Sequence, residues 1–304
     1  MSNIWRLNIK TDASGDVDPR MFCINNKILG VGWAVEFDGD VDWDTYYKLA
    51  MESYYNKGVK GWWPAVNALK NRMKENDLCW TRDWSGIYYL GRIVGEDWIY
   101  RGDKDYREAD VANIRHCDWK KVGEIDSVPG KVINSFIPPR AVQRVDDESV
   151  CLYSQFLFDS LSGHTHHSQP RQSADLFSLI SSEDCEDLVG LFLQEKGYRI
   201  IPSSCRIDTA AYEFVLKHAE TGNAAVVQVK QGYVDLNVDD YTTLQPKEVY
   251  LFTTHGKYTG GYSQNIYCIS PEEIKAFALN RRGVLSDRVK TWISIIEQLD
   301  KNAD

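Results

Sequence analysis

The sequence predicts a mixed α/β (α+β) protein with two domains, the first rich in strands and the second an α/β unit. Three observations support this class. The chain has 304 residues, more than one hydrophobic core usually serves. Aromatic, strand-like runs separated by turn signals fill residues 1–145, whereas helical and strand-like runs alternate in residues 176–304. Residues 146–175, between them, are polar and rich in Ser, His and Gln.

The first domain, residues 1–145, is expected to consist mostly of strands. Residues 43–74 are the exception, because they predict two short helices around a glycine-containing break, "NKGVKGWWP", with Pro64 at the start of the second helix. Turn signals such as "DWSG" and "GED" separate the predicted strands. The predicted strands are residues 4–10, 28–37, 78–83, 86–94, 98–101 and 119–122.

Residues 146–175 predict a linker between the domains. The stretch "DSLSGHTHHSQPRQSAD" is polar, and its second half has the composition of a flexible connection. We expect its three histidines, His164, His166 and His167, to be solvated surface residues. A metal site would need an ordered backbone, which this composition does not predict.

The second domain, residues 176–304, begins with a predicted helix. Leu188, Leu191 and Phe192 are spaced to occupy one helix face, and Gly197 ends the helix. The last predicted helix has an apolar face that serves either the core or a dimer contact. The predicted strands are residues 198–202, 212–216 and 225–230 with the runs "EVYLFTT" and "NIYCIS", and the later helices are "PEEIKAFAL" and "SDRVKTWISIIEQLD".

Composition and charge exclude several classes of protein. No run of about 18 apolar residues predicts a membrane span, and the first residues lack the apolar segment of a signal peptide. The seven cysteines are scattered without a CxxC pair, which is typical of reduced thiols in a cytoplasmic protein and argues against zinc. The net charge of −9 argues against a protein that coats nucleic acid. It does not exclude a nuclease whose acidic site recruits metal ions.

One short stretch, "AAVVQVKQG" at residues 224–232, points to chemistry. Side chains alternate across a strand, so Gln228 and Lys230 point to the same face of an otherwise apolar strand. We expect that face to need an oxygen ligand and a cation together. The alternative is that both are strand-end residues that face solvent, and that Asp208, upstream of them, is a turn residue.

Hydrolysis of a phosphodiester bond needs a divalent metal held by hard oxygen ligands, a positioned water and neutralisation of charge on the phosphate. Asp208 is the expected metal carboxylate, joined by the side-chain carbonyl of Gln228 and the backbone carbonyl of Val229. Lys230 is expected to orient the attacking water or stabilise the phosphate, and Glu186 to reach the metal or its waters. The expected cofactor is Mg²⁺, with Mn²⁺ able to substitute.

The order of these residues resembles that of a known nuclease family. "EDLVGLFLQEKGYRI", followed by Asp208 and then "AVVQVKQG", resembles the Mrr-like branch of restriction endonucleases in the PD-(D/E)xK superfamily, which commonly writes its last motif as QxK. The resemblance covers roughly residues 180–270. It implies a restriction-endonuclease-like α/β/α domain and a Mg-dependent endodeoxyribonuclease. The family often has glycines around the Asp, whereas this chain has "SSCRIDTAAYEF", so Glu213 is the reserve candidate for the acid.

The first domain resembles a different family. "NALKNRMKENDLCWTRDWSGIYYLGRI", with "IWRLNIK" and "GVGW", is similar to PUA-like domains of the EVE type over about residues 1–125. The resemblance implies a small β-barrel that binds a modified base, often flipped out of a duplex. Such a base needs aromatic faces for stacking and polar groups that read its edge. The residues expected to supply these are Trp33, Trp80, Thr81, Arg82, Asp83 and Trp84. The alternative for both Trp33 and Trp80 is a place in the core.

The sequence leaves three functions open. The first is an endonuclease of restriction or anti-phage defence, whose first domain senses a modified base and whose second domain cuts DNA. The second is a non-catalytic reader of nucleic acid with an inactive nuclease fold. The third is a nuclease switched on by a small nucleotide ligand. Because cutting both strands needs two active sites or a repositioning step, we expect a homodimer, or assembly on DNA, and no action at a membrane.

Overall fold

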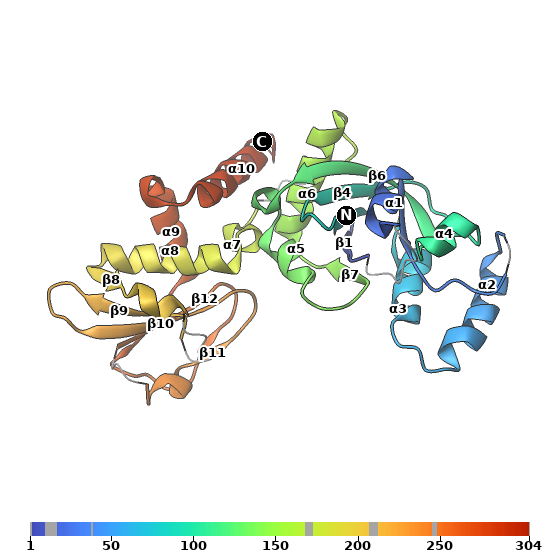
Figure 1. Cartoon of the computed structure of the whole chain (residues 1–304). Helices are drawn as coiled ribbons and strands as arrows, with labels where there is room; N and C mark the ends of the chain where they lie inside the picture. Colours follow the sequence, from blue (N-terminus) through green and yellow to red (C-terminus); the bar gives the residue numbers. More distant parts are fainter. Residues whose placement is uncertain are drawn as a thin grey trace. The chain divides into compact units, whose positions relative to one another are not determined.

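The computed structural model describes residues 2–9, 17–37, 39–167, 173–206, 212–244 and 248–303. It is a mixed α/β structure, as the sequence predicted (Figure 1). The chain divides into two compact units, a front unit of Met1–Ala174 with Leu299–Asp304 and a rear unit of Asp175–Gln298. Each unit has a main sheet of its own.

The main sheet of the front unit has the strand order β2-β6-β4-β3-β1-β7, with β5 paired to β6. The long β6 pairs antiparallel with β2, β4 and β5, so it connects three other strands. β1 pairs parallel with β3 and antiparallel with β7. The strand bounds are β1 Ile4–Leu7, β2 Ile28–Val31, β3 Leu78–Arg82, β4 Tyr88–Ile93, β5 Ile99–Tyr100, β6 Asn113–Gly123 and β7 Val142–Val145.

Helices of the front unit pack with this sheet around an aromatic core. α2 and α3 continue into π-helical turns at Met51–Tyr55 and Ala68–Arg72. The ring of Tyr46 lies 5.2 Å from the rings of both Trp98 and Tyr100. Many of the tryptophans and tyrosines therefore serve packing. The helix bounds are α1 Pro19–Asn25, α2 Trp43–Ala50, α3 Trp62–Asn67, α4 Lys104–Glu108, α5 Gly130–Ser135 and α6 Glu148–Ser162.

The predicted linker contains a helix. α6 ends at Gly163, whose φ of 71° suits a helix stop, and it packs against β1, β4 and β6. Val150, Tyr153 and Phe158 on its inner side are buried. The linker prediction is therefore wrong for this segment. The helix turns its apolar residues inward, and the polar composition of the stretch comes from its last turn and from the residues after it.

The histidines after α6 also differ from expectation. His164 and His166 are exposed, as predicted. His167 is only 5% exposed, and its Nδ1 lies 2.9 Å from Oδ1 of Asp159 on α6. The backbone N–H of His167 donates to the other oxygen of the same carboxylate at 3.1 Å. His167 thus ties the chain back to the end of α6.

The main sheet of the rear unit has five strands in the order β14-β12-β10-β9-β8. β10 lies at the centre, parallel to β12 and antiparallel to β9. The separate two-stranded sheet pairs β11 with β13. The strand bounds are β8 Tyr198–Ile200, β9 Phe214–His218, β10 Ala224–Lys230, β11 Leu236–Asn237, β12 Glu248–Thr253, β13 Tyr258–Thr259 and β14 Ile266–Ile269.

The two faces of this sheet are covered by different elements. α8 packs on one face, and Gly190 allows the close approach, because a Cβ there would lie 3.0 Å from Cδ1 of Ile200. On the other face Val226 of β10 packs with Leu236 and Val238. Figure 1 shows α8 on one side of the sheet and β11 on the other. The helix bounds are α7 Leu176–Leu179, α8 Ser182–Glu195, α9 Pro271–Asn280 and α10 Asp287–Ala303.

The start of α8 is firmly anchored. Ser181 and Asp184 form a reciprocal capping box, which satisfies two backbone N–H groups of the first turn. Asp184 is 1% exposed, and its Oδ1 accepts a hydrogen bond of 2.9 Å from Nε of Arg288 on α10. This anchor fixes the turn of α8 that carries Glu186.

The described residues contain no helix with both the length and the apolar character that crossing a membrane requires.

All seven cysteines lie in the described residues and carry free thiols. Burial raises the pKa of the Cys23 and Cys79 thiols far above the usual range, so they stay neutral. Within the described residues, no group of three or more His, Cys, Asp or Glu side chains is arranged to hold a metal.

A buried carboxylate joins strands of the front unit. Asp77, just before β3, is 2% exposed. Its side chain accepts from the backbone N–H of Asn3 at 2.7 Å, from Nε1 of Trp5 at 2.8 Å and from the backbone N–H of Lys74 at 3.0 Å. The start of β1 and the turn before β3 therefore depend on one acid.

We predict that Asp77→Ala lowers the free energy of unfolding by about 2–4 kcal/mol, because it leaves buried donors such as Nε1 of Trp5 without an acceptor. Urea denaturation followed by circular dichroism measures the effect. Asp126→Ala, at an exposed site of the same unit, is the matched control and should change stability by less than about 0.5 kcal/mol. Equal effects of the two substitutions would contradict the role given to Asp77.

Candidate functional site

The carboxyl end of β10 carries the two polar side chains that the sequence singled out. Gln228 is 1% exposed, although it is an amide. The register pairs Gln228 with Leu251 and Lys230 with Thr253 of β12, so both residues lie at the centre of the sheet. The side chain of Lys230 is 38% exposed. A buried amide therefore stands next to a cation that reaches solvent, on one face of the strand.

Glu213 completes this group. Val227 pairs with Phe214 of β9, which places Glu213 across from Gln228. The backbone N–H of Glu213 donates to the carbonyl of Val227 at 2.7 Å, which continues the ladder by one residue. Nε2 of Gln228 then donates to Oε1 of Glu213 at 2.7 Å, and Nζ of Lys230 lies 3.3 Å from the same oxygen. One carboxylate oxygen thus accepts hydrogen bonds from both an amide and an ammonium group.

The oxygen of the Gln228 amide is the unsatisfied atom of the group. Oε1 is buried and has no hydrogen-bond partner among the described residues. Leaving such an atom unpaired costs about 1–3 kcal/mol. The amide nitrogen, in contrast, donates to Glu213 and, at 3.3 Å, to the carbonyl of Val229. A buried amide oxygen with no partner is a suitable ligand for a hard cation.

Glu186 on α8 lies within electrostatic range of this group. Burial of the carboxyl, reinforced by the negative charges of Glu213, Glu183 and Asp187, raises the pKa of Glu186 to about 7. The positive charge of Lys230 acts in the opposite direction. Glu186 is therefore poised between its neutral and charged forms near neutral pH. This property suits a group that exchanges protons with water.

The donor set fits a magnesium site. Mg²⁺ usually binds proteins through one or two carboxylates and completes its shell with waters and substrate phosphates. Glu213 and Glu186 offer carboxylates, and Oε1 of Gln228 offers an unused buried oxygen. The backbone carbonyl of Val229, the other expected ligand, accepts from the Gln228 amide. Glu213 and Gln228 therefore supply side-chain oxygens at the end of β10, and Glu186 on α8 lies within electrostatic range of Glu213.

Asp208, the expected metal carboxylate, lies outside the described residues. Glu213, the reserve candidate, is the acid that contacts Gln228 and Lys230. The signal that favours it is its position directly before the strand that pairs antiparallel with β10. The register needed to use that signal is a tertiary property and does not follow from motif spacing.

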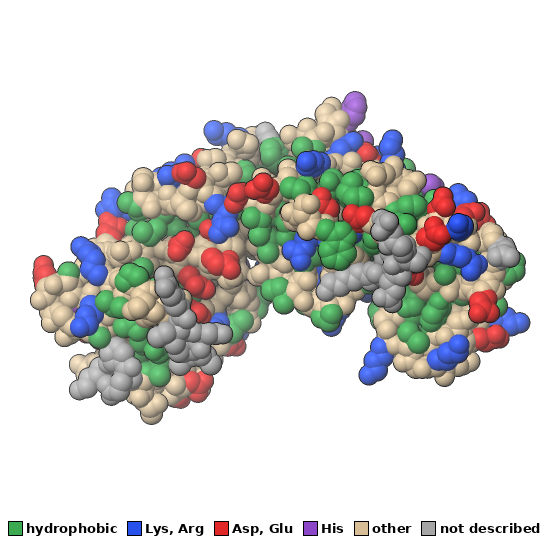
Figure 2. All heavy atoms as spheres, in the orientation of Figure 1, with side chains coloured by type: hydrophobic (Ala, Val, Ile, Leu, Met, Phe, Trp, Pro, Cys, Tyr) green, Lys and Arg blue, Asp and Glu red, His purple; other side chains and the backbone are tan. Residues whose placement is uncertain are grey.

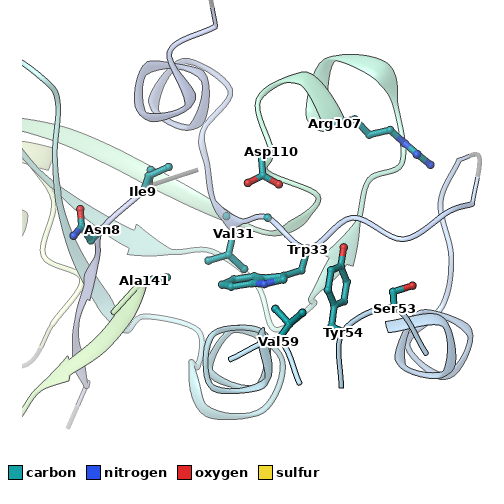
Figure 3. Close-up of a pocket in the computed structure, with 12 residues that line it drawn as sticks. Asn8, Ile9, Val31, Trp33, Ser53, Tyr54, Val59, Arg107, Asp110 and Ala141 are labelled. Carbon is teal, nitrogen blue, oxygen red and sulfur yellow. The ribbon is translucent and has the colours of Figure 1, made fainter. Parts of the chain in front are cut away.

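A second candidate site is a pocket of about 450 Å³ in the front unit (Figure 3). The Trp33 indole lies across the pocket, with Asp110 on one side of the ring and Val59 on the other. Most of the lining was not predicted from the sequence, because it comes from segments far apart in the chain. The lining residues are Asn8, Ile9, Gly30, Val31, Gly32, Trp33, Ser53, Tyr54, Val59, Arg107, Asp110 and Ala141.

Trp33 is the predicted reader residue that lines this pocket. Trp80 and Thr81 are fully buried in β3, where Nε1 of Trp80 donates to Oγ of Ser154 and the Thr81 hydroxyl donates to the carbonyl of Leu7. The structure therefore assigns Trp80 and Thr81 to the core and corrects their expected role as reader residues. The alternative of a core position was right for Trp80, whereas Trp33 both packs against the core and lines the pocket.

The other three predicted reader residues lie around the turn between β3 and β4. Asp83 accepts from the backbone N–H of Ile87 and so closes that turn. Trp84 is 67% exposed, and the guanidinium of Arg20 lies 3.8 Å from its ring centre. Arg82 lies over the ring of a phenylalanine. None of the three lines the pocket that contains Trp33.

Comparisons of the chain with protein-family models, with curated proteins and with solved structures find no match. The function is therefore argued from the chemistry of the two sites. The surface agrees with the acidic composition: on the face shown in Figure 2, basic and acidic side chains are interspersed, and the described residues form no broad basic patch there.

The raised pKa of Glu186 makes a prediction about stability. A carboxyl whose pKa rises from its ordinary 4.5 to about 7 on folding binds more protons in the folded state between these pH values. Its contribution to stability is therefore fully present below about pH 4.5 and is lost as the pH rises through 7. Glu186→Gln removes the charge, so the variant should be more stable than wild type at pH 8 by about 1–3 kcal/mol.

This gap should shrink as the pH falls toward 5, and urea denaturation in EDTA across the pH range measures it. Glu220→Gln, in an exposed turn of the same unit, should show no such pH-dependent gap. A Glu186→Gln variant that is less stable than wild type at pH 8 would rule out the claim that the ionised Glu186 carboxylate destabilises the folded state.

Proposed function

We propose that the chain is a metal-dependent endodeoxyribonuclease whose rear unit hydrolyses DNA phosphodiester bonds and whose front unit recognises a modified base. The observation that carries this proposal is the group at the end of β10. One oxygen of Glu213 accepts from Gln228 and Lys230, and the buried Oε1 of Gln228 lacks a partner among the described residues. The QxK order of the family resemblance agrees with this group.

The proposed reaction adds water across one P–O bond of the DNA backbone. The water oxygen bonds to phosphorus, the bond to the leaving oxygen breaks, and the proton lost by the water ends on that leaving oxygen. When bound, Mg²⁺ would lower the pKa of a coordinated water and neutralise negative charge on the phosphate. Glu213, Glu186 and Oε1 of Gln228 would hold it, and we retain Asp208 as a further proposed carboxylate from the neighbouring segment.

The protein side chains have distinct proposed roles. The Lys230 ammonium, held 3.3 Å from Glu213, is placed to stabilise charge on a phosphate oxygen or to orient the water. Glu186, with its pKa of about 7, is suited to accept a proton from that water near neutral pH. Gln228 is neutral, so the site holds a metal with less negative charge than a pair of acids would supply. This would lower the affinity of the site for a metal ion compared with a site built from two acids.

The biological role that fits this chemistry is restriction of modified DNA or defence against phage. The Trp33 pocket would supply recognition, and the β10 group would supply cleavage. Because duplex cleavage needs either two active sites or a repositioning step, we propose that the chain acts as a homodimer or assembles on DNA. With no broad basic patch on the visible face, affinity for DNA would depend on the bound metal and on the base pocket more than on general charge (Figure 2).

One observation favours a non-catalytic second candidate. Glu213 already accepts a hydrogen bond from Gln228 and pairs with Lys230. The same arrangement is expected of an inactive nuclease site in which the acid and the lysine remain as an internal ion pair. In that case the rear unit would bind nucleic acid or a partner without cutting. A nuclease that responds to a small nucleotide in the Trp33 pocket is distinguished by adding free nucleotides to a cleavage assay.

We predict that Lys230→Ala lowers DNA cleavage by about 100-fold or more, because it removes charge stabilisation from the transition state. The assay incubates the full chain with Mg²⁺ and duplexes that carry different cytosine and adenine modifications, with unmodified DNA as a reference. DNA binding in EDTA should be unchanged. Lys257→Ala, an exposed lysine of the same unit, is the control and should cut normally. Undiminished cleavage by Lys230→Ala would refute the catalytic assignment, and absence of cleavage by wild type on every duplex would favour the non-catalytic candidate.

A further inference from the structure

A solvent-exposed aromatic ring lies close to the β10 group in the chain. Tyr233 follows Lys230 by three residues and is 80% exposed. Three residues of chain span at most about 11 Å, which limits the distance between the two backbones. The ring is therefore close enough to contact a nucleotide beside a phosphate that is bound at Lys230.

The segment that leads to this tyrosine is fixed to the end of β12. The backbone N–H of Thr254 donates to the carbonyl of Lys230 at 3.1 Å, and that of His255 donates to the carbonyl of Gly232 at 3.2 Å. The N–H of Gly232 donates to Oγ1 of Thr254 at 2.8 Å. The side chain of Gln231 donates to two backbone carbonyls in and after α7, at 3.0 and 2.8 Å. These bonds hold the backbone on which the exposed ring is mounted.

His255 supports the ring of Tyr233 from the protein side. The two ring centres lie 5.2 Å apart and their planes differ by 32°, which is close to an offset stack. Nδ1 of His255 lies 3.0 Å from Oγ1 of Thr254, and Nε2 lies 2.9 Å from Oδ2 of Asp175. Nζ of Lys275 lies 2.6 Å from the other oxygen of Asp175. Both imidazole nitrogens are thus engaged within the protein, and His255 presents a ring face to Tyr233.

An exposed aromatic ring with such support suits the binding of a flat ligand. Proteins hold single-stranded nucleic acid by stacking its bases on aromatic side chains, with little preference among the bases. In a paired duplex the bases stack on one another, so their faces are covered and a side chain reaches only their edges. Tyr233 can therefore stack on a base that is unpaired, but not on one inside an intact duplex.

We propose that Tyr233 stacks on an unpaired nucleobase beside the phosphate that is cut, and that the rear unit therefore favours DNA whose bases are locally unpaired at this point. Tyr233 binds the substrate, and His255 is a positioning residue that acts through Tyr233. This inference rests on the proposed nuclease function of the rear unit and specifies the state of its substrate.

The experiment compares three forms of DNA that share one labelled strand. They are the single strand, the fully paired duplex and a duplex with a central run of mismatches. Binding of the full chain is measured by fluorescence anisotropy in EDTA, so that cleavage does not interfere. We expect the single strand and the mismatched duplex to bind about fivefold or more tightly than the paired duplex.

Tyr233→Ala should weaken binding of the single strand by about fivefold or more and change binding of the paired duplex by less than about twofold, because only the unpaired bases offer a face. Tyr233→Phe keeps the ring and should bind like wild type. Tyr262→Ala, at a tyrosine of the same unit that is 95% exposed, is the matched control and should also bind like wild type. Because both sites are exposed, the variants should fold, and a thermal melt checks that they do.

Equal binding of the three DNA forms by wild type, no binding of any form, or full single-strand binding by Tyr233→Ala would overturn the inference. Cleavage by wild type in Mg²⁺ without a preference for unpaired DNA would overturn it while the nuclease proposal stands. Loss of single-strand binding in Tyr233→Ala, together with no cleavage of any DNA by wild type, would support the stacking role and remove the catalytic function.

Discussion

The rear site depends on one buried amide. Gln228 lies at the centre of a five-stranded sheet, almost without exposure, and a polar side chain there must be satisfied. Its nitrogen is satisfied by Glu213, which fixes the acid across the antiparallel pair of β9 and β10. Its oxygen has no partner among the described residues. The same acid holds Lys230, so sheet register determines the positions of the acid, the amide and the amine together.

The two candidate sites share a physical design. In each, a buried side-chain amide has one polar atom without a hydrogen-bond partner among the described residues. In the rear unit the unused atom is the oxygen of Gln228, which suits a cation. In the front unit it is the nitrogen of Asn8, which can donate to a hydrogen-bond acceptor. Each site therefore has one unpaired polar atom, which a ligand atom of complementary character would satisfy: a cation or donor at Gln228 and an acceptor at Asn8.

Much of the fold follows from the sequence, because the apolar β-branched runs and the capped helices are local signals. β10 was predicted as residues 225–230 and spans Ala224–Lys230. The site follows less completely, since Glu213 acquires its role through a cross-strand register that motif spacing does not encode. Trp33 and Trp80 look alike in sequence, yet tertiary packing buries one in the core and leaves the other in a pocket. The pocket itself joins distant segments, so Asn8 and Asp110 carried no local signal.

The most direct test of the central claim is Mn²⁺ binding, followed by electron paramagnetic resonance of the free ion and measured without DNA. Wild type, Glu213→Gln and the exposed-site control Glu220→Gln are titrated side by side. The account predicts a saturable site in wild type and in the control, and an affinity at least about tenfold weaker in Glu213→Gln, because a ligand carboxylate is lost. Equal Mn²⁺ uptake by all three proteins would contradict a metal site at the end of β10.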